Sequence, residues 1–71
     1  MARYIVSTKR ELRGKVPTAA AAVASAPGVT VLSDHNLDMV TIDADPATAA
    51  DLQTELATTH YVEPEITRAL D

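Results

Sequence analysis

The order of strand-like and helix-like segments is the feature of this sequence that most restricts its fold. Four short segments are rich in β-branched residues and bounded by charged or turn-forming residues, which is typical of strands. They cover residues 3–8, 29–33, 39–44 and 60–66. Two Ala-rich segments predict helices at 17–26 and 46–58. The predicted order is therefore strand, helix, strand, strand, helix, strand.

Residues with special backbone properties mark the ends of both predicted helices. Pro17 and Pro46 can each occupy a first helical turn, because proline lacks the N–H group that is free there. Asp45 is expected to accept hydrogen bonds from free N–H groups of the second helix through its side chain. Pro27-Gly28 is expected to end the first helix, since this pair is typical of turns.

A right-handed crossover in each half of the chain places both helices on one face of a four-stranded antiparallel sheet. The second and third strands are expected to form a hairpin through a polar loop of roughly three to five residues. Pro64 cannot donate a ladder hydrogen bond, so the last strand belongs at an edge of the sheet. We therefore expect an α+β, ferredoxin-like open-faced sandwich (β-α-β-β-α-β) in residues 1–66, followed by an extended tail at 67–71.

The second face of this sheet has no helix in the chain to cover it. Side chains alternate between the two faces along a strand, so the residues of this open face can be assigned once the apolar sets pack under the helices. Those expected on the open face are Tyr61, Glu63 and Glu65 of the last strand, Met39 and Thr41 of the third, and either Tyr4 or Ile5 of the first. Apolar groups flanked by carboxylates are typical of a docking surface.

Catalysis is not expected from this chain. Its 71 residues leave too little mass for a nucleophile site with an oxyanion hole and a substrate pocket, and no G-x-S-x-G turn occurs. The candidate metal ligands Asp34, His35, Asp38 and His60 lack the spacing of a metal site, and Asp34 to Asp38 is typical of a turn. The sequence therefore predicts a binding module without a cofactor or metal.

Composition also argues against several partners. The chain has no cysteine for a thiolate copper site, only two tyrosines to stack on RNA bases, and a net charge of −4, which disfavours nucleic acid. No apolar run is long enough to span a membrane, and none at the start resembles a signal peptide. We therefore expect either a cytoplasmic protein or a part of a longer secreted precursor.

The glutamate pair in the last strand has two interpretations. Charges on an edge strand discourage aggregation between sheet edges. Alternatively, Glu63 and Glu65 bind helix N-termini of a partner, which offer free N–H groups and a partial positive charge. Two carboxylates about 7 Å apart along one strand face can cap two adjacent helices.

Three stretches of the chain resemble a known family. They are "RYIVST" at the start, "PGVTVLSDHNLDMVTIDAD" in the middle and "HYVEPE" near the end. They look like the propeptides of subtilisin-type serine proteases and the free-standing inhibitors related to them. The resemblance implies that the bare sheet face docks on two surface helices of the protease, with Glu63 and Glu65 at the helix N-termini.

The resemblance also implies that the tail blocks the active-site cleft of the protease. The tail residues are Thr67, Arg68, Ala69, Leu70 and Asp71. Either Asp71 fills the primary specificity pocket with Arg68 in the fourth subsite, or Leu70 fills the pocket with Thr67 in the fourth subsite.

Two questions of function stay open at this level. The chain acts either in trans as a separate inhibitor or chaperone, or as a propeptide of an enzyme that follows Asp71. The alternative function is a small ferredoxin-like regulatory or ligand-binding domain that associates with itself through the open sheet.

Overall fold

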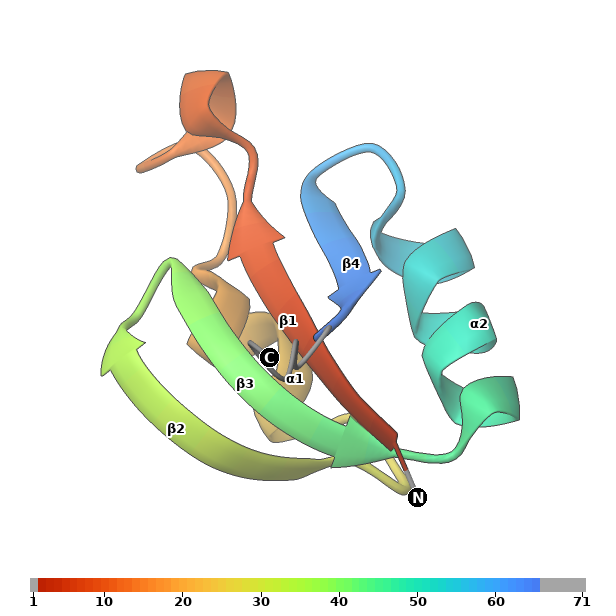
Figure 1. The fold of residues 1–71 in the computed structure, drawn as a ribbon. Helices are drawn as coiled ribbons and strands as arrows, with labels where there is room; N and C mark the ends of the chain where they lie inside the picture. The colour runs from red at the N-terminus through yellow and green to blue at the C-terminus, as the bar shows by residue number, and fades with distance from the viewer. Residues whose placement is uncertain (1, 66–71) are drawn as a thin grey trace, which may run out of the picture.

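A computed structural model describes residues 2–65, the side chain of His35 excepted, and its elements are shown in Figure 1. The strands are β1 (Ala2–Thr8), β2 (Thr30–Asn36), β3 (Met39–Ala44) and β4 (His60–Pro64). The helices are α1 (Ala19–Ala24), α2 (Pro46–Leu56) and a short 3-10 helix at Arg10–Leu12. The sequence predicted the order of the four strands and of α1 and α2, but not the 3-10 helix.

The four strands form one antiparallel sheet in the order β2-β3-β1-β4, with β1 and β3 in the middle (Figure 1). This α+β, ferredoxin-like arrangement confirms the predicted fold class. The prediction that the last strand lies at an edge is also confirmed. Pro64 can stand there because β4 needs backbone donors only toward β1.

The core lies between the sheet and the two helices. Val6 of β1 is fully buried and pairs directly with Val40 of β3 on one side and Val62 of β4 on the other. The helices add Val23 and Leu52, which are almost completely buried. The core alanines Ala19, Ala44 and Ala49 bury little apolar area each, so the domain depends on close contact between helices and sheet.

Helix α1 (Ala19–Ala24) is shorter than the predicted 17–26. It begins later because Thr18 is its N-cap, so Pro17 lies before the helix and not in its first turn. The Thr18 side chain accepts a hydrogen bond from the Ala21 N–H group over 3.2 Å, which satisfies a free donor of the first turn. Pro17 precedes the cap, and its carbonyl oxygen accepts a hydrogen bond from Nε2 of His60 over 2.9 Å. The helix ends at Ala24, before the predicted Pro27-Gly28 turn.

Helix α2 begins as predicted but is capped differently. Pro46 occupies the first helical turn, which the sequence predicted. Asp45 makes no side-chain capping bond, so that prediction was wrong; its backbone carbonyl accepts the Ala49 N–H group over 2.9 Å. The helix ends at Leu56, two residues earlier than predicted, and the Leu56 carbonyl then accepts the Thr59 N–H group over 3.0 Å.

The β2–β3 hairpin is tighter than the predicted polar loop. Strand β2 continues to Asn36, and only Leu37 and Asp38 form the turn. The Asn36 side chain accepts the Asp38 N–H group over 2.9 Å, a local bond that closes such turns. Pairing between β2 and β3 is irregular on both sides of Ser33, and irregular pairing weakens an edge as a template for another strand.

Removal of the Thr8 hydroxyl tests how the sheet holds the start of α1. Thr8 is buried and accepts the Ala19 N–H group over 3.1 Å. Thr8→Val keeps the shape but leaves this N–H group unpaired, so we expect the free energy of unfolding in urea to fall by about 1–3 kcal/mol. Thr54→Val, at an exposed position of α2, is the matched control. Equal stability of the two variants would contradict this role of Thr8.

Candidate functional site: the open face of the sheet

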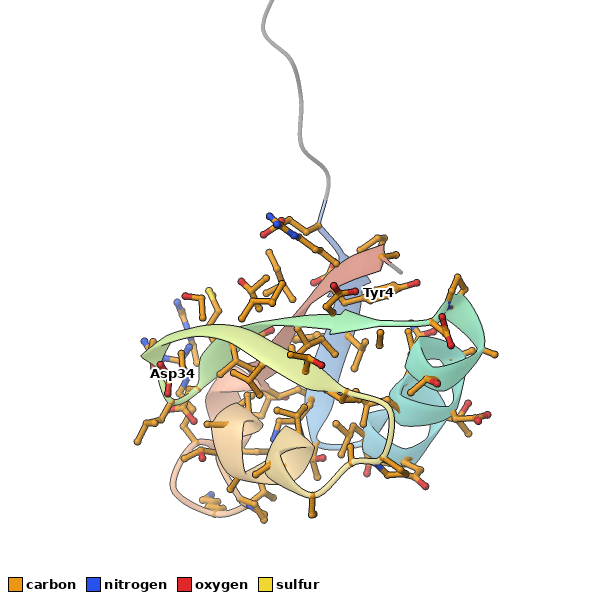
Figure 2. All side chains as sticks on the ribbon, turned by 90° about the horizontal axis from the view of Figure 1, so that it is seen from below. Tyr4 and Asp34 are labelled. Atoms are coloured by element: carbon orange, nitrogen blue, oxygen red, sulfur yellow. The ribbon has the colours of Figure 1, made fainter. Side chains whose placement is uncertain are left out.

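Both helices lie on the same side of the sheet, and no element of residues 2–65 covers the other side (Figure 2). We call this uncovered side the open face. Side chains alternate between the two sides of each strand, and the buried ones face the helices. The residues between the buried ones therefore lie on the open face. The open face of the three paired strands consists of Arg3, Ile5 and Ser7, of Met39, Thr41 and Asp43, and of Tyr61, Glu63 and Glu65.

The strand register arranges these nine residues in three rows that cross β3, β1 and β4. The apolar row is Met39, Ser7 and Tyr61, the middle row is Thr41, Ile5 and Glu63, and the charged row is Asp43, Arg3 and Glu65. Polarity therefore changes along the strands, from half-exposed apolar side chains at one end of the open face to charged groups at the other.

The charged groups of the open face are only weakly neutralised within the domain. Arg3 Nη1 lies 3.9 Å from Glu65 Oε1, and the Arg3 side chain is 65% exposed, so this ion pair contributes little. Glu63 is exposed and forms no ion pair within residues 2–65. Asp43 Oδ1 is buried and has no hydrogen-bond partner in the same part of the chain. The exposed carboxylate of Glu63 and the partly exposed one of Glu65 can therefore accept hydrogen bonds from a partner.

The apolar row is exposed and partly fixed in place. Met39 and Tyr61 each expose 50% of their surface. The ammonium group of Lys9 lies 5.3 Å from the centre of the Tyr61 ring and also donates a hydrogen bond to the Ala57 carbonyl over 2.8 Å. This cation–π contact restricts the ring of Tyr61 at one edge of the open face.

The residues that the sequence assigned to the open face lie on it: Met39, Thr41, Tyr61, Glu63 and Glu65. The sequence left open whether Tyr4 or Ile5 lies on the open face, and in the structure it is Ile5. The tail residues Thr67, Arg68, Ala69, Leu70 and Asp71 lie outside the described residues.

Tyr4 faces the helix side of the sheet. It pairs with Ile42 and Pro64 and packs against the core, and Figure 2 shows it reaching toward the start of α2. Sequence reasoning did not name Arg3, Ser7 and Asp43 as open-face residues. The alternation that places Ile5 and Thr41 there also assigns these three.

The candidate metal ligands His60, Asp34 and Asp38 belong to the core or to the β2–β3 hairpin. His60 is buried, and its ring nitrogens lie 2.9 Å from the Pro17 carbonyl and 2.6 Å from the Thr59 hydroxyl. Asp34 lies toward the hairpin end of β2 (Figure 2), and Asp38 belongs to the hairpin turn. Among the side chains that the structure describes, which leave out that of His35, no three potential ligands approach one another closely enough to hold a metal ion.

A hollow of about 400 Å³ lies on the helix side, between α2 and the connection from α1 to β2. Its apolar wall includes Pro27, Val29 and Leu52, and Asp51 and Glu55 contribute carboxylates. The lining contains no His, Cys, Lys or Ser side chain. The open face differs from this hollow in combining apolar and charged groups in a regular pattern, and it is the better candidate for recognition.

Comparison with protein-family models, with curated proteins and with solved structures found no match to this chain. No helix in the described part of the chain is long and apolar enough to cross a membrane. The residues and the geometry of the open face are therefore the features of this chain that indicate a function.

Proposed function

We propose that this chain inhibits a subtilisin-like serine protease, assists its folding, or does both, without catalysis of its own. The open face docks on the protease, and the C-terminal tail enters the active-site cleft. One observation carries the proposal: Glu63 of the edge strand β4 and Glu65, directly after its end, lie on the same uncovered face, and neither is strongly paired within residues 2–65. The resemblance of "HYVEPE" to the propeptides of these proteases supports it.

The glutamates are suited to bind helix N-termini. Side chains two residues apart on a strand lie about 7 Å apart, and neighbouring packed helices have axes about 8–10 Å apart. Glu63 pairs with Ile5 within β4, and the Glu65 N–H group, just after β4, donates to the Arg3 carbonyl over 2.9 Å, so the backbone of both is held in place before binding. Each carboxylate can then accept bonds from free N–H groups and interact with the positive end of the helix dipole.

The tail has sufficient length for a blocking role. Residues 66–71 follow Glu65, and an extended chain covers up to about 3.3–3.6 Å per residue, or roughly 20 Å in total. By the resemblance, this segment occupies the subsites on the acyl side of the cleft, as a cleaved product would. The carboxylates then anchor the domain, and the tail blocks the enzyme.

The second candidate is a regulatory domain that associates with itself through the open face. The half-exposed Met39 and Tyr61 favour it, because exposed apolar groups also promote association between copies. Assays of inhibition and of oligomeric state separate the two. Inhibition of a subtilisin-like protease by a monomer supports the first, and a dimer without inhibition supports the second.

Glu63→Ala and Glu65→Ala are each expected to weaken inhibition. A hydrogen bond to a charged group contributes about 1.5–3 kcal/mol, so each inhibition constant is expected to rise roughly 10-fold to 100-fold. Glu55→Ala removes an exposed carboxylate on the helix side and serves as the matched control. Thermal unfolding checks that all variants fold. Unchanged inhibition in both single variants and the double variant would leave only a role against aggregation.

Deletion of residues 67–71 is expected to abolish inhibition. The product-like mechanism requires this segment in the cleft, whereas self-association through the open face does not require it. Terminal residues usually contribute few buried contacts, so the melting temperature is expected to stay almost unchanged. Full inhibition by the folded, truncated chain would contradict the blocking mechanism even if the glutamate variants behaved as expected.

Substitutions at the last two positions decide the register of the tail. If Asp71 fills the primary pocket of a broad-specificity subtilisin, Asp71→Leu is expected to tighten inhibition, because an unpaired carboxylate in an apolar pocket is costly. If Leu70 fills it, Leu70→Ala is expected to weaken inhibition, and changes at Asp71 are expected to have almost no effect. The absence of any effect at either position would exclude both registers.

A further inference from the structure

The loop between β1 and α1 concentrates the positive charge of the chain. Residues 9–15, which we call the basic loop, contain four of the six Lys and Arg residues and one of the ten Asp and Glu residues. We infer that the basic loop is a separate contact with the partner and binds a carboxylate-rich patch on the protease surface. This inference rests on the proposed function and concerns a part of the domain outside the open face.

Local hydrogen bonds and two partly buried side chains fix the course of the basic loop. The Leu12 carbonyl accepts the N–H group of Lys15 over 2.9 Å and that of Val16 over 3.2 Å. Leu12 and Val16 are half-buried. Gly14 has a φ of 80°, a left-handed conformation that favours glycine and lets the chain turn there. The charged side chains therefore stand on an ordered backbone, which loses less conformational freedom when a partner binds.

Three cations of the basic loop have no charged partner inside the domain. Arg10, Arg13 and Lys15 are exposed, and none of them forms an ion pair within residues 2–65. Cations so close together repel one another, and in a chain with a net charge of −4 they reduce the net charge that favours solubility. Neither the fold nor solubility accounts for these cations, whereas a partner of opposite charge does.

The basic loop lies at the apolar end of the open face and extends beyond the end of β1 (Figure 1). Lys9 contacts the Tyr61 ring there, six residues along the chain from Arg3 of the charged row. A strand rises about 3.3 Å per residue, so the charged row lies roughly 20 Å from the start of the loop. This distance exceeds the Debye length of about 8 Å at physiological ionic strength. The loop and the glutamates therefore do not neutralise each other through solvent.

The charges around the basic loop favour a compact acidic patch over a long polyanion. Glu11 stands within the loop, and the rest of the chain contains nine acids and two cations. A nucleic acid or a sulfated polysaccharide is negative along its whole length and would also meet these carboxylates. A folded protein can place Asp and Glu side chains opposite the three exposed cations alone. The geometry of charge thus fits a protein surface.

Contacts between exposed charges act mainly on the rate of association. Such ion pairs contribute little to affinity, because water and salt screen them. Complementary charged surfaces, however, raise the association rate constant by about 10-fold to 1000-fold. Changes of charge at the edge of an interface accordingly change this rate constant and its dependence on salt. The basic loop is therefore expected to set how fast the protease is bound.

Neutralisation of the basic loop tests the inference through the rate of inhibition. The loop variant combines Arg10→Gln, Arg13→Gln and Lys15→Gln, and progress curves with a panel of subtilisin-like proteases give the association rate constant. At low ionic strength we expect this constant to fall at least about tenfold and to depend less on added NaCl. Glu11→Gln removes the acid of the loop and is expected to raise the constant about twofold. Thermal unfolding checks that each variant folds.

A control of equal net charge separates the basic loop from the charge of the whole molecule. It combines Ala24→Glu, Ala47→Glu and Ala50→Glu at exposed positions of α1 and α2. Its net charge equals that of the loop variant, but the loop is intact. We expect its association rate constant to fall much less than that of the loop variant. An equal fall in both would overturn the assignment to the loop.

Carbodiimide crosslinking identifies the surface that the basic loop contacts. This reagent joins an amine to a carboxylate in contact with it, and we expect Lys15 to be joined to an Asp or Glu side chain of the protease. Lys15→Arg keeps the charge and removes the amine. It is expected to lose the crosslink while the association rate constant stays unchanged. A crosslink that persists in this variant would contradict the contact of Lys15.

The possible outcomes separate the inference from the proposed function. Inhibition at an unchanged rate by the folded loop variant would overturn the inference and leave the proposed function standing. Retention of the original chain on heparin at physiological ionic strength, lost in the loop variant, would assign the loop to a polyanion and would also overturn it. If the folded original chain inhibits no protease of the panel, the proposed function fails, and the inference fails with it.

Discussion

The two-sided pairing of β1 is the interaction on which the rest of the structure depends. Val6 is in direct register with Val40 and Val62, and all three face the helices. This register decides which side of three strands is buried, because a shift of one residue would exchange the two faces of a strand. The 71 residues supply two helices for one face and no second layer within residues 2–65 for the other. The open face thus follows directly from how the core is built.

The same alternation that builds the core also organises the open face. Each buried residue of β1 is followed by one that points away from the helices, so Ile5 and Ser7 occupy fixed positions between their neighbours on β3 and β4. The apolar row and the charged row then stand at opposite ends of a rigid surface. A surface with this polarity favours one orientation of a bound partner.

Much of the fold could be predicted from the sequence because its signals are local. The β-branched runs, the Ala-rich segments and Pro64 gave the element order and the edge position of β4, and alternation placed Glu63 and Glu65 on the open face. The start of α1 could not be predicted this way. It depends on Thr8, which accepts the Ala19 N–H group, and on His60, which bonds the Pro17 carbonyl from 43 residues away.

Other features depended on competition between local signals. Asp45 has the residue type of a side-chain cap but accepts through its backbone only, and Asn36 closes the hairpin through a bond that composition does not specify. Of the candidate site, the carboxylates and the exposed face were predictable from alternation. The contacts of Lys9 with the Tyr61 ring and with the Ala57 carbonyl could not be predicted, because they join the loop after β1 to β4 and to the end of α2.

The central claim is that the open face, and not the helix side, contacts a subtilisin-like protease. Methyl cross-saturation in the complex between the isotope-labelled chain and a protonated protease measures this contact directly. We expect strong saturation transfer to the methyl groups of Ile5 and Met39 and almost none to those of Ala50 and Leu56 on α2. Transfer confined to the methyl groups of α2, with Ile5 and Met39 unaffected, would contradict the account.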